Sequence, residues 1–244
     1  MKKVFTKVFL GLCALGVSVV AFAQDVAPAV EQSFHQALKT KFIEGDAGFM
    51  SLVAIALILG LAFVLERIIY LNLADTNADK LLKGIEAALD KGDVEAAKAI
   101  ARDTRGPIAS IAYQGLMRID QGIDVVEKSI VSYGGVQGGL LEKNMSWITL
   151  FIAMAPSLGF LGTVVGMIMA FDKIEQVGDI SPTVVAGGMK VALITTVGGL
   201  IVALILQVFY NYLLSKLESI LNKMEDASIS LLDLVIKYDV KYKK

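Results

Sequence analysis

Three runs without a charged residue dominate the pattern of apolar and polar positions along this 244-residue chain. They cover residues 49–65, 144–171 and 191–215. A helix rises about 1.5 Å per residue, so the longest run gives roughly 42 Å of helix, against about 30 Å for the hydrocarbon core of a bilayer. The first run is at the short end for a spanning helix. The pattern predicts an all-α membrane protein with three transmembrane helices.

The second and third runs each carry a face of small residues at helical spacing. On the second run this face holds Ala155, Gly159, Thr163, Gly166 and Ala170. On the third run it holds Ala192, Thr196, Gly199, Ala203, Gln207 and Asn211. Small residues allow close packing of helices in lipid, and Gly162-x-x-x-Gly166 is a contact motif of that kind. A water-lined path is the other interpretation, and the spacing alone leaves both open.

The three runs contain no aspartate, glutamate or histidine. A proton relay through a membrane uses titratable side chains, because a hydroxyl passes a proton without storing one near neutral pH. If protons cross here, a second chain must bring the acid. The nearest charges are Lys190, just before the third run, and the Glu66-Arg67 pair, just after the first. We expect both to be anchors at the membrane interface, with the long side chains of Glu66 and Arg67 reaching it beside Tyr70.

The segments outside the runs follow helical patterns. Leu81, Ile85 and Leu89 share a face, Asp93 suits a helix cap and Pro107 suits a helix start. The C-terminal tail repeats the apolar stripe, which predicts a cytoplasmic helical bundle extending the membrane helices. The glycine-rich stretch 134–139 lacks the lysine and hydroxyl of a phosphate-binding loop, so it predicts a hinge or a close helix contact.

Residues 1–23 have the basic start, apolar middle and Ala21-Phe22-Ala23 site of a secretory signal peptide, with a retained first helix as the alternative. One cysteine and one histidine exclude a disulfide framework within the chain and a thiolate metal cluster. A net charge of −1 gives no electrostatic case for nucleic acid. No nucleophile, base or metal cluster converges, so we predict no enzyme and no cofactor.

The distribution of lysine and arginine predicts the orientation. Ten lie between Arg67 and Lys143 and six from Lys216 onward, against two in each of the segments 24–48 and 172–190. The middle region and the tail are therefore predicted to face the cytoplasm. The predicted order is signal peptide 1–23, periplasmic N-terminal segment 24–48, transmembrane helix 49–71, cytoplasmic helical region 72–145, transmembrane helix 146–172, periplasmic loop 173–189, transmembrane helix 190–214 and cytoplasmic C-terminal helix 215–244.

Two strings of residues resemble the signature of the MotA/TolQ/ExbB proton channel family. The first is Ala155-Pro156, Leu158-Gly159, Leu161-Gly162-Thr163-Val164 and Gly166-Met167. The second is Ala192-Leu193-Ile194-Thr195-Thr196, Gly199-Leu200-Ile201-Val202-Ala203 and Tyr210-Asn211. Three spans with a large cytoplasmic segment after the first resemble ExbB and TolQ more than the four-span MotA.

The resemblance implies a homopentamer in the bacterial inner membrane, with a single-span ExbD-type partner that supplies an aspartate and a TonB-type protein that transmits the work. It assigns Thr163 and Thr196 to the pore. The remaining residues of the helix-packing and pore stripe are Ala155, Pro156, Gly159, Gly162, Gly166, Gly199 and Ala203. Val191 stands where many ExbB and TolQ chains carry a glutamate, which leaves more of the role to the partner's acid. The alternatives are a TolQ-like subunit of an envelope-maintenance Tol system, a flagellar-type stator and a non-conducting membrane scaffold.

Overall fold

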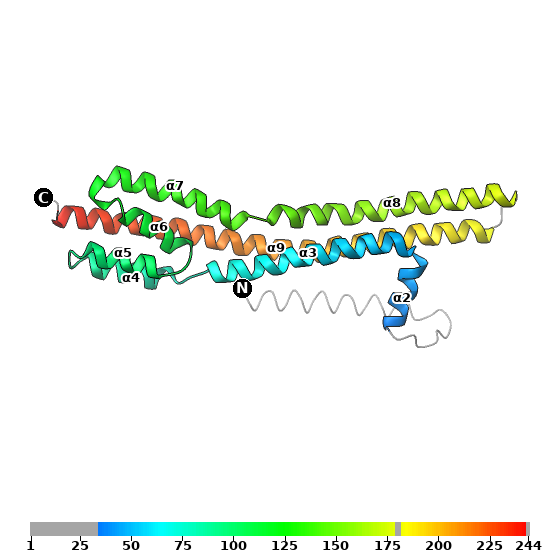
Figure 1. Ribbon diagram of the computed structural model, residues 1–244, viewed down its shortest axis with the longest axis horizontal. Helices are drawn as coiled ribbons and strands as arrows, with labels where there is room; N and C mark the ends of the chain where they lie inside the picture. The colour runs from blue at the N-terminus through cyan, green and yellow to red at the C-terminus, as the bar shows by residue number, and fades with distance from the viewer. Residues whose placement is uncertain (1–33, 179–181, 243–244) are drawn as a thin grey trace. The chain divides into compact units, whose positions relative to one another are not determined.

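The computed structural model describes residues 34–178 and 182–242, and every regular element among them is helical (Figure 1). The predicted signal peptide, the segment 24–33 and His35's side chain lie outside the described part. The elements are α2 (Phe34–Glu44), α3 (Ala47–Ala74), α4 (Ala78–Leu89), α5 (Val94–Asp103), α6 (Pro107–Leu116), the 3-10 turn η1 (Ile119–Gln121), α7 (Ile123–Glu142), α8 (Met145–Val177) and α9 (Pro182–Tyr242). The chain divides into a unit of residues 1–43 and a unit of residues 44–244. In the first unit, α2 is the described element.

The second unit holds three stretches that are long and apolar enough to cross a membrane by length and composition. Their apolar parts lie in α3, α8 and α9, which confirms the all-helical fold with three long apolar helices. The third predicted span and the predicted tail helix are one continuous helix of 61 residues. The predicted loop 173–189 is largely helical, because α8 runs to Val177 and α9 begins at Pro182.

Local sequence signals account for most helix ends. The Asp93 carboxylate accepts a hydrogen bond from the Ala96 amide at 2.9 Å and caps α5, as predicted. Pro107 occupies the first turn of α6, also as predicted. Of the two alternatives for 134–139, the hinge is wrong, because α7 passes through those glycines unbroken. As to a close helix contact, an added Cβ at Gly138 would lie 3.5 Å from the Leu221 side chain of α9, which is ordinary contact. The break comes later, where Asn144 takes φ of 66° between α7 and α8.

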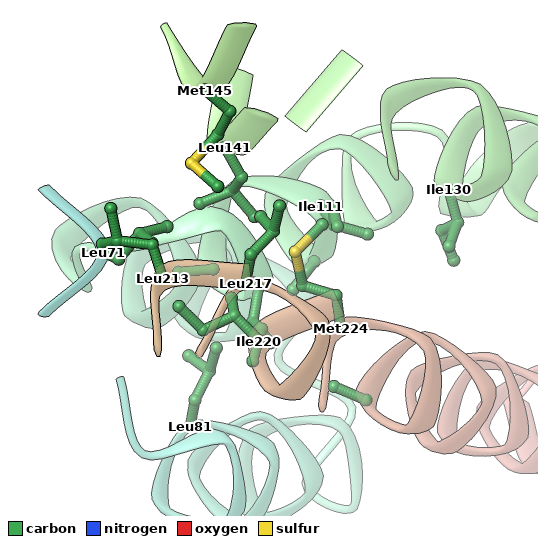
Figure 2. Packing of buried hydrophobic residues seen from close by; sticks show 14 of the residues in the cluster. Leu71, Leu81, Ile111, Ile130, Leu141, Met145, Leu213, Leu217, Ile220 and Met224 are labelled. Atoms are coloured by element: carbon green, nitrogen blue, oxygen red, sulfur yellow. The ribbon is translucent and has the colours of Figure 1, made fainter. Parts of the chain in front are cut away.

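A hydrophobic core joins helices α4 to α7 to the second half of α9 (Figure 2). Leu217, Ile220 and Met224 of α9 are buried there together with Leu81 of α4 and Ile111 of α6. The predicted apolar stripes of the helical bundle therefore face one another in this unit. Figure 2 also shows Leu71, Leu141 and Met145 at the edge of this core, where α3, α7 and α8 meet α9.

The C-terminal end of α3 departs from the prediction. Arg67 does not extend to an interface, since its side chain is only 3% exposed. Its guanidinium forms a two-pronged ion pair with Glu66 and lies 4.5 Å from the centre of the Tyr70 ring. It also donates to the Leu141 carbonyl at 3.5 Å, in the last turn of α7. A buried arginine needs such partners, because an unpaired buried charge is costly.

Candidate functional site

Helices α8 and α9 run antiparallel and approach almost to backbone contact. A Cβ atom added at Gly199 would lie 2.5 Å from the Ala155 carbonyl oxygen, and one added at Gly159 would lie 2.8 Å from the Thr195 carbonyl oxygen. At Gly162 an added Cβ would meet the Thr195 side chain at 2.8 Å. These glycines are required for the close approach, which is the arrangement that small residues permit in lipid.

We call the surface where the two helices meet the packed face. From α8 it contains the buried residues Ala155, Gly159, Gly162, Gly166 and Ala170. From α9 it contains the buried residues Ala192, Thr195 and Gly199. The predicted small-residue stripe therefore lies mainly in a contact within the chain, but its two threonines do not. Thr163 and Thr196 are half-buried beside the packed face.

Two neighbouring threonines of α9 have different surroundings. Thr195 is fully buried, and its hydroxyl donates to the Ala192 carbonyl at 2.8 Å. Thr196 is half-buried, and its hydroxyl reaches the same carbonyl at 3.3 Å. On α8, the Thr163 hydroxyl donates to the Phe160 carbonyl at 2.6 Å. Each hydroxyl is thus satisfied by its own helix, and each oxygen keeps acceptor capacity.

Thr163 and Thr196 lie at the same level and on the same side of the helix pair. Each follows a packed residue, Gly162 and Thr195, that touches its counterpart. A step of one residue turns about 100° around a right-handed helix, and in two antiparallel helices that face one another this turn leads to the same side. The two threonine side chains therefore flank one groove.

Helix α3 covers the opposite side of the α8–α9 pair. Gly198, on the far side of α9 from Thr196, approaches Met50 of α3, with 3.1 Å between an added Cβ and the Met50 methyl group. On α8, Phe151 stacks on Phe63 of α3, with 6.1 Å between ring centres. The threonine side is thus the side of the pair that α3 leaves uncovered.

We call this uncovered side the threonine face, and it consists of Pro156, Thr163, Thr196, Ala203 and Gln207. All five residues are half-buried, and Gln207 donates to the Asn211 side chain at 3.3 Å. The face offers hydroxyl and amide oxygens among small or apolar side chains, and it carries no ionisable group. Such a face cannot hold a proton near neutral pH. Among the described residues, no cluster of His, Cys, Asp and Glu could hold a metal ion.

The charges at the ends of the spans are paired. Lys190, next to Val191 on α9, forms an ion pair with Glu44 at 2.7 Å. Glu66 receives the Arg67 guanidinium described above and a 3.4 Å hydrogen bond from the Asn144 amide. Both sites join different helices, so their side chains hold helix ends together. The sequence suggested anchors to the interface and missed these partners, since pairing between distant segments leaves no local pattern.

The sequence also missed Thr195 as a residue of the contact. The period of small residues in a sequence locates a helix face only approximately. It cannot decide which of two adjacent threonines points into the contact. Gly162 is the signal that could have separated them. A glycine at that position leaves room for one side chain of the neighbouring helix, and the antiparallel register places Thr195 there.

Comparison with known proteins agrees with the resemblance. Residues 103–226 match the MotA/TolQ/ExbB proton channel family. A putative biopolymer transport protein ExbB homolog of Methanothermobacter thermautotrophicus is 28% identical over 176 residues, which are 71% of this chain and 62% of that protein. Biopolymer transport protein exbB1 of Vibrio cholerae is 37% identical over 33% of this chain and 39% of its own length. Biopolymer transport protein ExbB of Aquifex aeolicus is 35% identical over 32% of this chain and 53% of its own length. The chain therefore spans between 39% and 62% of the length of these relatives.

Proposed function

The chain belongs to the MotA/TolQ/ExbB proton channel family, and from this premise we propose that it is an inner-membrane proton-channel subunit of the stator type. With an ExbD-type partner it couples the proton-motive force to TonB-dependent outer-membrane transport. The proposed assembly is a homopentamer of multi-pass chains whose α8 and α9 surround single-span helices of the partner. The partner supplies the aspartate, and a TonB-type protein carries the work onward without a cofactor.

The position of Thr163 and Thr196 carries this proposal. They lie level with one another on the threonine face, while the glycines beside them are occupied by packing within the chain. A face with hydroxyls and no acid suits a wall against which the partner's carboxylate exchanges its proton. The absence of Asp, Glu and His from the runs 144–171 and 191–215 supports a division of the chemistry between two chains.

The proposal includes an orientation. Residues 1–23 are removed as a signal peptide, the new N-terminus and the α8–α9 connection face the periplasm, and α4–α7 with the second half of α9 face the cytoplasm. The lysine and arginine distribution supports this orientation. The long helix α9 would then pass directly from the membrane into the cytoplasmic bundle.

The test replaces single threonines by valine, which has nearly the same shape and no hydroxyl. We expect Thr163→Val and Thr196→Val each to reduce TonB-dependent uptake of a labelled substrate at least tenfold. Co-purification of the ExbD-type partner stays unchanged. Thr195→Val is the matched control, because its hydroxyl is buried in the packed face and bonds only to its own helix. It should retain uptake within twofold.

Other outcomes distinguish the alternatives. A non-conducting scaffold predicts that both pore variants transport normally and that Gly159→Leu alone prevents assembly, since only packing matters there. A TolQ-like subunit predicts that the threonine variants spare TonB-dependent uptake and impair envelope integrity, measured as leakage of a periplasmic enzyme. If all three threonine variants lose uptake equally, the threonine face has no special role.

A further inference from the structure

We propose that a cavity between α6 and α7, in the predicted cytoplasmic region, binds a small phosphate monoester. The cavity has a volume of about 390 Å³. Its polar lining consists of Gln114, Arg118, Lys128, Ser129, Ser132 and Tyr133. The cavity is a groove that is largely open to solvent, and its volume lies at the small end of the range of about 300–1,000 Å³ that is usual for small-molecule sites.

The cavity has an excess of positive charge. Arg118 Nη1 donates to the Gln114 side-chain oxygen at 2.8 Å and to the Ser129 hydroxyl at 2.9 Å, and both acceptors are neutral. Those bonds position the guanidinium without neutralising it. Lys128, one turn from Ser132, makes no ion pair or hydrogen bond within the described residues. No carboxylate is among the residues that line the cavity.

These groups match the chemistry of a phosphate monoester. A phosphate ester carries about −1.5 to −2 charge at pH 7 and three strong acceptor oxygens. Arg118 and Lys128 supply the two positive charges, and the hydroxyls of Ser132 and Tyr133 supply further donors. Val125 and Val136 complete the lining with apolar surface, which suits the carbon part of the ester.

The position along α7 favours a soluble ester over a lipid headgroup. Ser132 precedes Asn144, where α8 and the second uncharged run begin, by about 18 Å of helix. A lipid phosphate lies at the membrane surface, so it does not reach a site at that depth in the cytoplasmic bundle. The proposal is independent of the pore, since neither Arg118 nor Lys128 belongs to the threonine face.

Phenyl phosphate is the probe, followed by ³¹P NMR with the full-length chain in complex with its partner in a phosphorus-free maltoside detergent. We expect saturable broadening of the ester resonance. Lys128→Gln should weaken binding at least fivefold and Arg118→Gln at least tenfold, because charge-assisted hydrogen bonds are lost. Lys83→Gln, which removes an exposed cation of α4 outside the cavity, is the matched control and should bind as the parent does.

Three results would overturn the proposal. One is the absence of saturable broadening with the parent complex. Another is equal affinity for phenyl phosphate in the parent and in Lys128→Gln. The Lys128 side chain makes no bond whose loss could unfold the chain, so this variant is a fair test. The third is displacement of phenyl phosphate by phosphatidylglycerol micelles as effectively as by inorganic phosphate. Uptake should stay within twofold in Lys128→Gln, so loss of the site and loss of the pore give different results.

Discussion

The two halves of α9 pack against their neighbours with different kinds of side chain. The half from Pro182 to about residue 214 meets α8 through small residues, among them Thr195 and Gly199. The half beyond it buries large residues, among them Leu217, Ile220 and Met224. In lipid, an apolar side chain gains little by leaving its surroundings, so helices rely on close van der Waals contact. In water, burying a leucine or isoleucine stabilises by about 1.5–3 kcal/mol. At its contact with α8 the helix therefore needs small residues, whereas the core around its second half needs large ones.

Polar groups follow the same division. Within the uncharged run 191–215, the Thr195 and Thr196 hydroxyls bond to a carbonyl of their own helix. Beyond that run, Lys216 and Lys223 both bind Asp75, which ends α3. Bonds inside one helix do not depend on a neighbour, whereas the lysine pairs tie α9 to a segment about 140 residues earlier. The comparison predicts that the two halves respond to different substitutions.

The largest effect is expected from Gly199→Leu in the membrane half. An added Cβ there already meets three backbone atoms, of Ala155 and Gly159, within 3.2 Å. Backbone atoms of two helices cannot yield without separating the pair, so no folded complex should be recovered. Size-exclusion chromatography of the detergent-extracted protein measures this. Gly139→Leu is the matched control, because nothing lies within 4 Å of an added Cβ on that α7 residue.

The control should behave as the parent or better, since glycine costs a helix interior about 1 kcal/mol relative to alanine. A normal yield of folded Gly199→Leu would contradict the close approach. A failed Gly139→Leu would show instead that an unseen partner covers α7.

Much of this architecture could be predicted from the sequence because it depends on local patterns. The uncharged runs located the three long helices, and Asp93 and Pro107 located two helix starts. A helical tail extending the third span was predicted, but its start was set at residue 215, because a change from apolar to mixed composition reads as a boundary even where the backbone continues. Of the two alternatives for the glycine stretch, the hinge was wrong, since α7 continues despite a propensity cost of about 1 kcal/mol per glycine.

What could not be predicted depends on contacts between distant segments. Burial of Arg67 depends on the Leu141 carbonyl and on Glu66, and only the first of these is far away in sequence. That Thr195 and not Thr196 points into the packed face depends on the register between α8 and α9. Single-sequence periodicity gives the direction of a face, and the register comes only from both helices together.

A smaller effect is expected from Ile220→Ala in the second half of α9. Ile220 is 1% exposed in the core of Figure 2. Truncating a buried isoleucine to alanine typically costs about 2–5 kcal/mol through lost burial and the cavity left behind. We expect a folded but less stable complex, measured by chemical unfolding with Trp147 fluorescence. Ile229→Ala is the matched control on the same helix, since Ile229 is 59% exposed. Equal destabilisation by the two substitutions would remove the distinction between core and surface.

The smallest effect is expected from Asp75→Asn, which tests the polar half of the comparison. Lys216 and Lys223 lie 2.6 and 2.5 Å from the carboxylate, and their hydrogen bonds, that of Lys216 first, hold the pKa of Asp75 below its ordinary value of 3.8. A carboxyl group whose pKa is lowered by folding stabilises the folded state at pH values above its ordinary pKa. That contribution is lost as the pH falls through the pKa of the folded state. Because both pairs are partly exposed, we expect Asp75→Asn to lower the free energy of unfolding by about 1 kcal/mol at pH 7.

The pH dependence distinguishes the ion pairs from simple loss of a side chain. The gap between the parent and Asp75→Asn, measured by thermal unfolding at pH 7 and at pH 3, should narrow at the lower pH as the parent's carboxyl becomes protonated. Asp233→Asn, at an exposed carboxylate of α9 for which the described structure shows no ion pair, should leave stability unchanged at both values. A gap of constant size would mean that the charge of Asp75 is not what stabilises, since asparagine keeps the backbone N–H that bonds to the Leu71 carbonyl at the end of α3. The second half of α9 would then be held by its apolar core and by ion pairs further along, such as that of Lys237 with Glu86.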